Sequence, residues 1–251
     1  MNNKFRSKIL RHLKTQIHLF KTQLVNSHRI PIKKNVHQLR ITSRRIRAAI
    51  WIIEHGTPHL SFKKLLSELR KLSRVLGQLR ELDVAIQDAN KYHLKTSKLK
   101  KKRQSARNTL LSQTNSRHRK KIVTYLNKAL IKIQNHQEQK IASGVVVLRK
   151  RILPWAQKKI VTEDDFHRLR ILTKKTRYIL ETIGKPVQPL RELQDVLGKG
   201  HDLEVLQDFS KRNPKIQNAS KEQYRSALHM VRPTLHFAVK QLSTGMRERS
   251  K

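Results

Sequence analysis

The residues best suited to chemistry lie in a basic pattern of eleven residues that occurs twice. The pattern His-x-Leu-Arg-Ile-x-(Ser/Thr)-basic-basic-x-Arg runs from His37 to Arg47 and again from His167 to Arg177. On a helix, its first, fourth, eighth and eleventh residues fall on one face over about 15 Å. Each copy therefore predicts a linear array of cations. The arrays are His37, Arg40, Arg44 and Arg47, and His167, Arg170, Lys174 and Arg177.

The first basic stripe lies between two apolar edges. Burying guanidinium groups beside apolar surface without a counter-charge is unfavourable, so the pattern predicts a polyanionic partner. The alternative is that the long arginine side chains reach past their apolar neighbours into water, but the second copy of the pattern favours the first interpretation. The apolar positions are Leu39, Ile46, Ile50 and Ile53 on one side and Ile41, Ala48 and Ile52 on the other.

The composition requires a partner of opposite charge. The 251 residues include 57 Lys+Arg and 17 Asp+Glu, which gives a formal net charge of +40. Internal ion pairs cannot neutralise such an excess, so nucleic acid, polyphosphate or an anionic membrane surface is expected to bind. Composition alone does not choose among these partners. The hydrophobic content of 37% still suffices for a core if it is concentrated on helix faces.

Several classes of site and location are disfavoured by what the sequence lacks. The absence of cysteine excludes disulfides, thiolate metal sites and cysteine nucleophiles, and it fits a reducing compartment. No histidine pair with helical spacing has an obvious third ligand, so we expect neither a metal nor a cofactor. No segment approaches the roughly 18 apolar residues of a membrane span. We therefore expect a soluble, cytoplasmic protein with no membrane contact.

The elements that position the basic stripes are predicted to be helices throughout. Nearly every segment has a 3.6-residue period, so the fold class is all-α, with two four-helix bundles in one compact unit. We place the first repeat at 1–140 and the second at 141–251. Thr162 and Asp165 predict a capping box, and Pro233 predicts a kink. The expected helical regions are about 4–27, a motif helix that follows Pro31 and ends at about 55, and then 60–92, 97–139, 142–160, 163–183, 189–212 and 219–247.

Each repeat also has a glycine inside its third helix, at Gly77 and Gly198. Glycine in mid-helix costs roughly 1 kcal/mol relative to alanine, so two such glycines need a reason. Helical spacing places Gly77 in a second basic stripe with Arg70, Arg74 and Arg80. Either another helix packs closely at these positions, or a bound anion approaches the backbone there.

These motifs together resemble the CHAD domain, a histidine-containing helical repeat family, over essentially the whole chain. The matching segments are VHQLRITSRRIRAAI and FHRLRILTKKTRYIL, followed by LSRVLGQLRELDV and LQDVLGKGHDLEV. The resemblance implies two pseudo-symmetric bundles that form one domain around a central basic channel or cleft, and non-enzymatic binding of inorganic polyphosphate. Polyphosphate bodies would then be one cellular location. The implied contacts are His37, Arg40, Arg44, Arg47, Arg70, Arg74, Arg80, His167, Arg170, Lys174, Arg177, Arg191 and His201.

The sequence departs from the repeat in one respect and from the family's usual companion in another. The second repeat has Asp195 and His201 where the first has Arg74 and Arg80, so the two halves are not electrostatically equivalent. The chain also contains no ExExK motif, which marks the triphosphate-hydrolysing domain that often accompanies this family. We therefore expect no such activity from this chain.

Two other functions remain as alternatives. Non-specific binding to the phosphates of duplex nucleic acid is compatible with the net charge and with the basic runs at 98–103 and 117–121, although such runs often form a solvated helix face. Aromatic residues amount to only 5%, which disfavours base stacking. A histidine phosphotransferase or phosphatase would need metal-binding carboxylates or a phosphate loop. We expect Asp83, Asp202 and Glu204 to orient arginines and histidines instead.

Overall fold

Every regular element of the computed structural model is an α-helix across the residues that it describes, 2–57, 59–136, 141–210 and 213–247. This confirms the all-helical fold class. Four of the predicted helices, those expected at about 4–27, 60–92, 142–160 and 163–183, have bounds within three residues of those expected at both ends, and the capping box of Thr162 and Asp165 is present with both of its hydrogen bonds. The helices are α1 (Asn2–Arg29), α2 (Lys33–Gly56), α3 (Lys63–Lys91), α4 (Ser97–Gln113), α5 (Ser116–Asn135), α6 (Ile141–Gln157), α7 (Glu163–Thr182), α8 (Gln188–Gln207) and α9 (Pro214–Arg247).

The fourth helical region of the first repeat is two helices, not one. The Asn115 side chain accepts a hydrogen bond from the His118 N–H at 3.0 Å and caps the start of α5. The Thr114 hydroxyl donates to the Leu110 carbonyl at 2.7 Å at the end of α4. Neither glycine nor proline marks this turn, so periodicity alone gave no reason to divide the segment. The described part of the first repeat therefore has five helices where four were expected.

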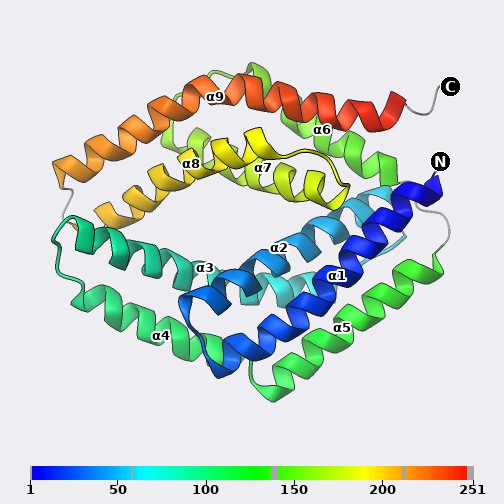
Figure 1. Cartoon of the computed structure of the whole chain (residues 1–251), viewed down its shortest axis with the longest axis horizontal. Coiled ribbons are helices and arrows are strands. Elements are labelled where there is room, and N and C mark those ends of the chain that lie inside the picture. The colour runs from blue at the N-terminus through cyan, green and yellow to red at the C-terminus, as the bar shows by residue number, and fades with distance from the viewer. Residues whose placement is uncertain (1, 58, 137–140, 211–212, 248–251) are drawn as a thin grey trace.

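The four helices that carry the basic motifs lie in the middle of the molecule. Helix α2 contacts α1, α3, α6 and α7, and α8 contacts α3, α7 and α9. Figure 1 shows α9 along one long edge and α4 with α5 along the opposite edge, with α2, α3, α7 and α8 between them. The two motif helices, α2 and α7, are therefore neighbours, as are the two third helices, α3 and α8.

The two sequence repeats share one hydrophobic core. Helix α6, which begins the second repeat, packs against α2 of the first repeat, and a side chain at Gly144 would meet the Ile52 carbonyl oxygen at 2.6 Å. One cluster of buried residues extends through both repeats and includes Phe20, Ile46 and Leu169. The proposed boundary near residue 140 lies outside the described residues.

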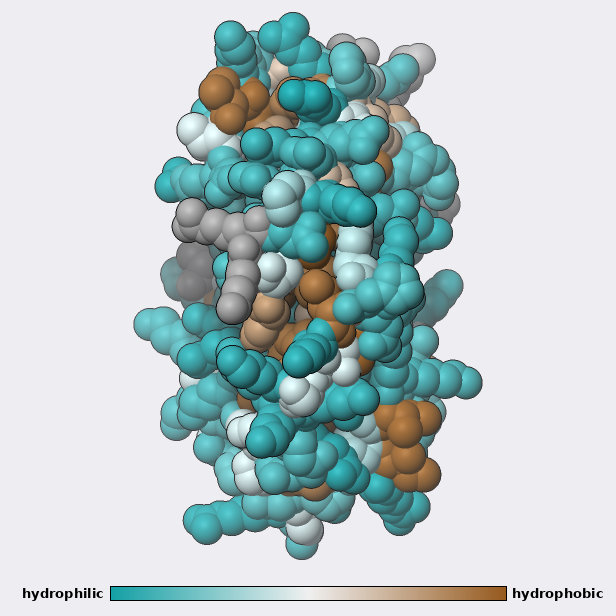
Figure 2. Space-filling view, turned by 90° about the vertical axis from the view of Figure 1, so that its left-hand side faces the viewer, coloured by the Kyte–Doolittle hydropathy of each residue, from teal (hydrophilic) through white to brown (hydrophobic). Residues whose placement is uncertain are grey.

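The core confirms one apolar edge predicted for α2, because Leu39, Ile46, Ile50 and Ile53 are all buried, whereas Ile41 of the other edge is only half-buried. Helix α9 continues through Pro233 and is bent in Figure 1, as expected for an internal proline. Hydrophilic residues cover most of the molecular end in Figure 2, with hydrophobic residues inside a central hollow. Among the described helices, none has both the length and the apolar character that crossing a membrane requires.

Candidate anion-binding site

The two copies of the basic pattern meet at a pocket of about 540 Å³ between α2, α3 and α7. Residues from both copies line this pocket, which we call the motif pocket. Its walls are also partly apolar, because Ala48, Leu66 and Ile171 contribute to them. The predicted contact residues that line it are Arg44, Arg47, Arg70, His167, Arg170 and Lys174.

Arg40 and Arg170, which hold the same position in the two copies, have unsatisfied donors. The Nε atom of each is buried and has no hydrogen-bond partner. Burial and then Arg44 lower the pKa of Arg40 to about 10, and burial lowers the pKa of Arg170. Buried polar groups in proteins are normally hydrogen-bonded. Two equivalent guanidinium groups are therefore partly desolvated without a complete set of acceptors.

Lys174 is the most strongly perturbed cation of the motif pocket. Burial, followed by Arg170, Arg44 and Arg40, lowers its pKa to about 6. None of the ion pairs between described residues includes this lysine. A lysine in this environment is largely uncharged at neutral pH, and a nearby anion would favour its charged form.

The pKa values of the two motif histidines, His37 and His167, are also lowered. Burial and then Arg80 lower the pKa of His37, and burial and then Arg170 lower that of His167. Burial lowers the pKa of both histidines more than like-charge repulsion does. The ring of His201 lies 5.9 Å from that of His167, and His201 Nδ1 lies 3.6 Å from Glu204 Oε2. These two histidines are brought together although they come from different helices.

Arg177 has a different environment from its counterpart Arg47. It is buried, its guanidinium donates to Glu181, and its Nε donates to Gln194 Oε1 at 2.9 Å. Glu181 also accepts from Arg45 Nε at 3.2 Å, so one carboxylate joins both motif helices. Arg177 is therefore already paired inside the protein, and it is not among the residues that line the motif pocket.

The other predicted contact residues do not line the motif pocket; besides Arg177 they are His37, Arg40, Arg74, Arg80, Arg191 and His201. Arg80 is half-buried and acts electrostatically on both His37 and Arg40. Arg74 and Arg191 are exposed and do not line the motif pocket.

The two glycines at matching positions of α3 and α8, Gly77 and Gly198, do not serve close helix packing. A side-chain carbon at Gly77 or Gly198 would meet no atom within 4 Å, outside the helix's own backbone. The space beside both is therefore open. Close packing occurs instead at Gly200, where an added carbon would lie 2.8 Å from Tyr224 Cε1.

Among the residues of the motif pocket that were not predicted from the sequence are Trp51 and Lys175. Burial, then Arg151 and Arg47, lower the pKa of Lys175 to about 8. The Lys175 amine lies 3.9 Å from the centre of the Trp51 ring. Two signals were present: Lys175 occupies the second of the adjacent basic positions, and Trp51 lies one turn after Arg47.

The acidic residues near the motifs contact cations. Asp83 accepts from Arg103 Nε at 2.6 Å. Asp202 interacts electrostatically with His201, Arg80 and Arg170. Within the described residues, no group of three or more His, Cys, Asp or Glu side chains has an arrangement that could hold a metal ion.

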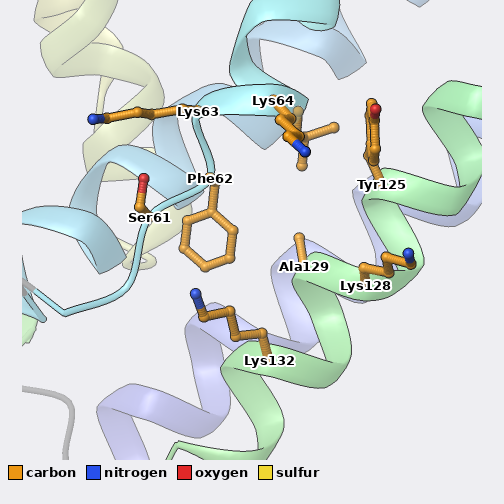
Figure 3. A pocket seen from close by; sticks show the side chains of 9 residues that line it. Ser61, Phe62, Lys63, Lys64, Tyr125, Lys128, Ala129 and Lys132 are labelled. Atoms are coloured by element: carbon orange, nitrogen blue, oxygen red, sulfur yellow. The ribbon is translucent and has the colours of Figure 1, made fainter.

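A second cationic pocket, of about 330 Å³, lies between the start of α3 and α5. Its lining includes Phe62, Lys63, Lys64, Lys128 and Lys132, and no residue of either motif. In Figure 3 the amines of Lys64 and Lys132 lie towards Phe62, whereas those of Lys63 and Lys128 point away. Its lining has four lysines and, unlike that of the motif pocket, no arginine or histidine.

The protein is thus, by class, an all-helical domain in which two basic helices, α2 and α7, border one pocket that Arg170 lines with an unsatisfied Nε. Comparison with known proteins identifies the family. The CHAD domain family matches residues 25–211, and the chain belongs to it.

Two solved structures share this fold. The crystal structure of the CHAD domain from the plant Ricinus communis has a TM-score of 0.70 and 21% identity, and the alignment covers 92% of this chain and 91% of that chain. PptA from Streptomyces chartreusis has a TM-score of 0.60 and 16% identity, with 96% and 99% covered. No curated protein matches the chain. At these identities the similarity establishes the fold.

Proposed function

We propose that the chain binds inorganic polyphosphate without chemical turnover, and that the motif pocket is part of a basic channel or cleft for this ligand. The observation that carries the proposal is the pair of equivalent arginines, Arg40 and Arg170, with buried and unsatisfied Nε donors. Phosphate oxygens are suitable acceptors for these donors, because guanidinium groups form strong charge-assisted hydrogen bonds with phosphate.

A flexible chain of phosphates fits the site better than a duplex does. The cations of the motif pocket lie between packed helices, in a space of about 540 Å³. A single phosphate chain can enter such a space, whereas the major groove of B-DNA alone is about 12 Å wide. Duplex DNA would have to use exposed cations instead. The run of Lys98, Lys100, Lys101 and Lys102 is exposed and supports that alternative.

Binding without catalysis is proposed because the acidic residues already have cationic neighbours. Asp83 pairs with Arg103, and Glu204 lies beside His201. These carboxylates are suited to orient the cations of the site. The open space beside Gly77 and Gly198 gives a ligand access to the backbone of α3 and α8.

The test is a competition between long-chain polyphosphate and duplex DNA, matched in phosphate concentration, at physiological salt. We expect polyphosphate to displace the DNA, and also to bind more tightly per phosphate than pyrophosphate does, because successive phosphates on one chain remain at high local concentration. Equal or tighter binding of DNA would favour the nucleic-acid alternative. Equal affinity per phosphate for pyrophosphate would contradict binding along an extended array.

A further inference from the structure

The motif pocket combines a nucleophile with phosphate-binding groups. Lys174 lines it together with Arg44 and Arg170, and Arg40 acts electrostatically on the same amine. The lysine is partly exposed within the pocket, so a small molecule can reach it. The pocket therefore places an accessible amine among several guanidinium groups.

Burial and like charge keep the Lys174 amine uncharged. Asp202 acts in the opposite direction, but burial and three arginines outweigh it and lower the pKa to about 6. Only the uncharged amine has a free electron pair, so such a lysine is a nucleophile at neutral pH. The exposed lysines at 98–102 have no comparable burial.

The surrounding arginines select the reagent. Guanidinium groups bind phosphate, so a small molecule with a phosphate group and an electrophilic carbon would be held beside the amine. We propose that Lys174 is an acylation site for small acyl phosphates, whose phosphate group binds to the arginines of the same pocket. The inference rests on the proposed function in one respect, which is that these arginines bind phosphate.

The reaction is an acyl transfer. The Lys174 Nζ electron pair attacks the acyl carbon, the N–C bond forms, and the bond from that carbon to the phosphate oxygen breaks. The departing phosphate takes up the proton that the amine loses, so the products are an amide and hydrogen phosphate. Arg47 and Arg70 also line the pocket, so the bound phosphate and Asp202 do not neutralise the whole cluster.

Acylation would also regulate the proposed binding. The amide cannot take up a proton, so Lys174 could no longer contribute a charge when a polyanion binds. We expect Lys174→Gln, which carries an uncharged amide, to weaken polyphosphate binding about tenfold, as for the loss of one charge-assisted contact. The same change at exposed Lys100 should have little effect. Equal affinities for the two variants would overturn this regulatory role.

The site is tested with acetyl phosphate on the wild-type protein at pH 7, with the acetylation rate of each lysine followed by mass spectrometry. We expect Lys174 to react at least about tenfold faster than Lys98 or Lys100, because its amine is largely uncharged. Acetic anhydride, which has no phosphate, is the control reagent. The preference for Lys174 should be larger with acetyl phosphate. An equal preference with both reagents, or none with acetyl phosphate, would overturn the inference.

Failure here can be distinguished from failure of the proposed function. Long-chain polyphosphate should protect Lys174 from acetyl phosphate. Rapid acetylation without protection would support the acylation site and contradict polyphosphate binding in this pocket. Slow acetylation of Lys174 in a protein that binds polyphosphate tightly would overturn only the acylation site.

Discussion

Two variants with the same net charge can show whether polyphosphate binds at an organised site or merely to the overall positive charge. One variant replaces four motif cations with glutamine, and a control variant replaces four exposed lysines. Both lose the same formal charge from a chain that carries +40. We expect the first variant to lose much more affinity for polyphosphate. The motif set is Arg40, Arg44, Arg170 and Lys174, and the control set is Lys98, Lys100, Lys101 and Lys102.

The expected difference follows from the two environments. Each control lysine is exposed, and an exposed ionic contact contributes about 0.2–1 kcal/mol because water and salt screen it. A charge-assisted hydrogen bond in a partly desolvated site contributes about 1.5–3 kcal/mol. If only two motif cations each contribute about 1.5 kcal/mol more than an exposed contact, Kd rises by about two orders of magnitude more in the motif variant.

The assay is polyphosphate binding at several salt concentrations, with helicity measured by circular dichroism. Both variants should keep wild-type helicity, and the motif variant should unfold at the same or a higher temperature because repulsion among its cations is relieved. The slope of affinity against salt should fall in both variants. Equal losses of affinity in the two variants would refute the reasoning and favour non-specific binding by net charge.

Three further perturbations test individual features of the structure. Polyphosphate binding at pH 7 should take up protons and weaken as pH rises, because the pKa of Lys174 is about 6 without ligand and a bound anion raises it. Calorimetry in buffers of different ionisation enthalpy measures the proton uptake, and zero uptake would contradict the prediction. Gly77→Ala should stabilise the fold by about 0.5–1 kcal/mol. Gly200→Ala should destabilise it by about 1 kcal/mol or more, because its added carbon meets a tyrosine ring. Thermal unfolding should show that the two substitutions change stability in opposite directions. Arg47→Gln should lower the affinity for polyphosphate with little change in stability. Arg177→Gln should lower the free energy of unfolding by roughly 3 kcal/mol with little change in affinity, because it breaks a buried ion pair. Denaturant unfolding and binding assays distinguish the two outcomes.

The fold was predictable because local signals and hydrophobic periodicity agree along most of the chain. The capping box before α7 and the buried edge of α2 are sequence patterns that the structure reproduces. The division between α4 and α5 was not predictable from periodicity, because its signal is local: Asn115 is a favoured N-cap residue and caps α5. How α6 packs on α2 depends on contacts between repeats, which no local pattern specifies.

The grouping of cations was predictable only in part. Spacing along one helix indicated that Arg40, Arg44 and Arg47 lie on one face, but it did not indicate that α2 and α7 are neighbours. The perturbation of Lys174 comes from arginines on both helices and from burial between them. It is therefore a tertiary property, which the sequence of either motif alone does not contain.

The inequality of the two motif copies does have a signal in the sequence, one turn after each motif. Four residues after Arg177 lies Glu181, whereas four residues after Arg47 lies Trp51. An acid at this spacing can pair with the arginine along the helix, and Glu181 does so while also accepting from Arg45. Trp51 has no charge and leaves Arg47 at the pocket, where the same ring contacts Lys175. The last arginine of the second copy is thus committed to an internal ion pair, whereas its counterpart in the first copy remains at the pocket.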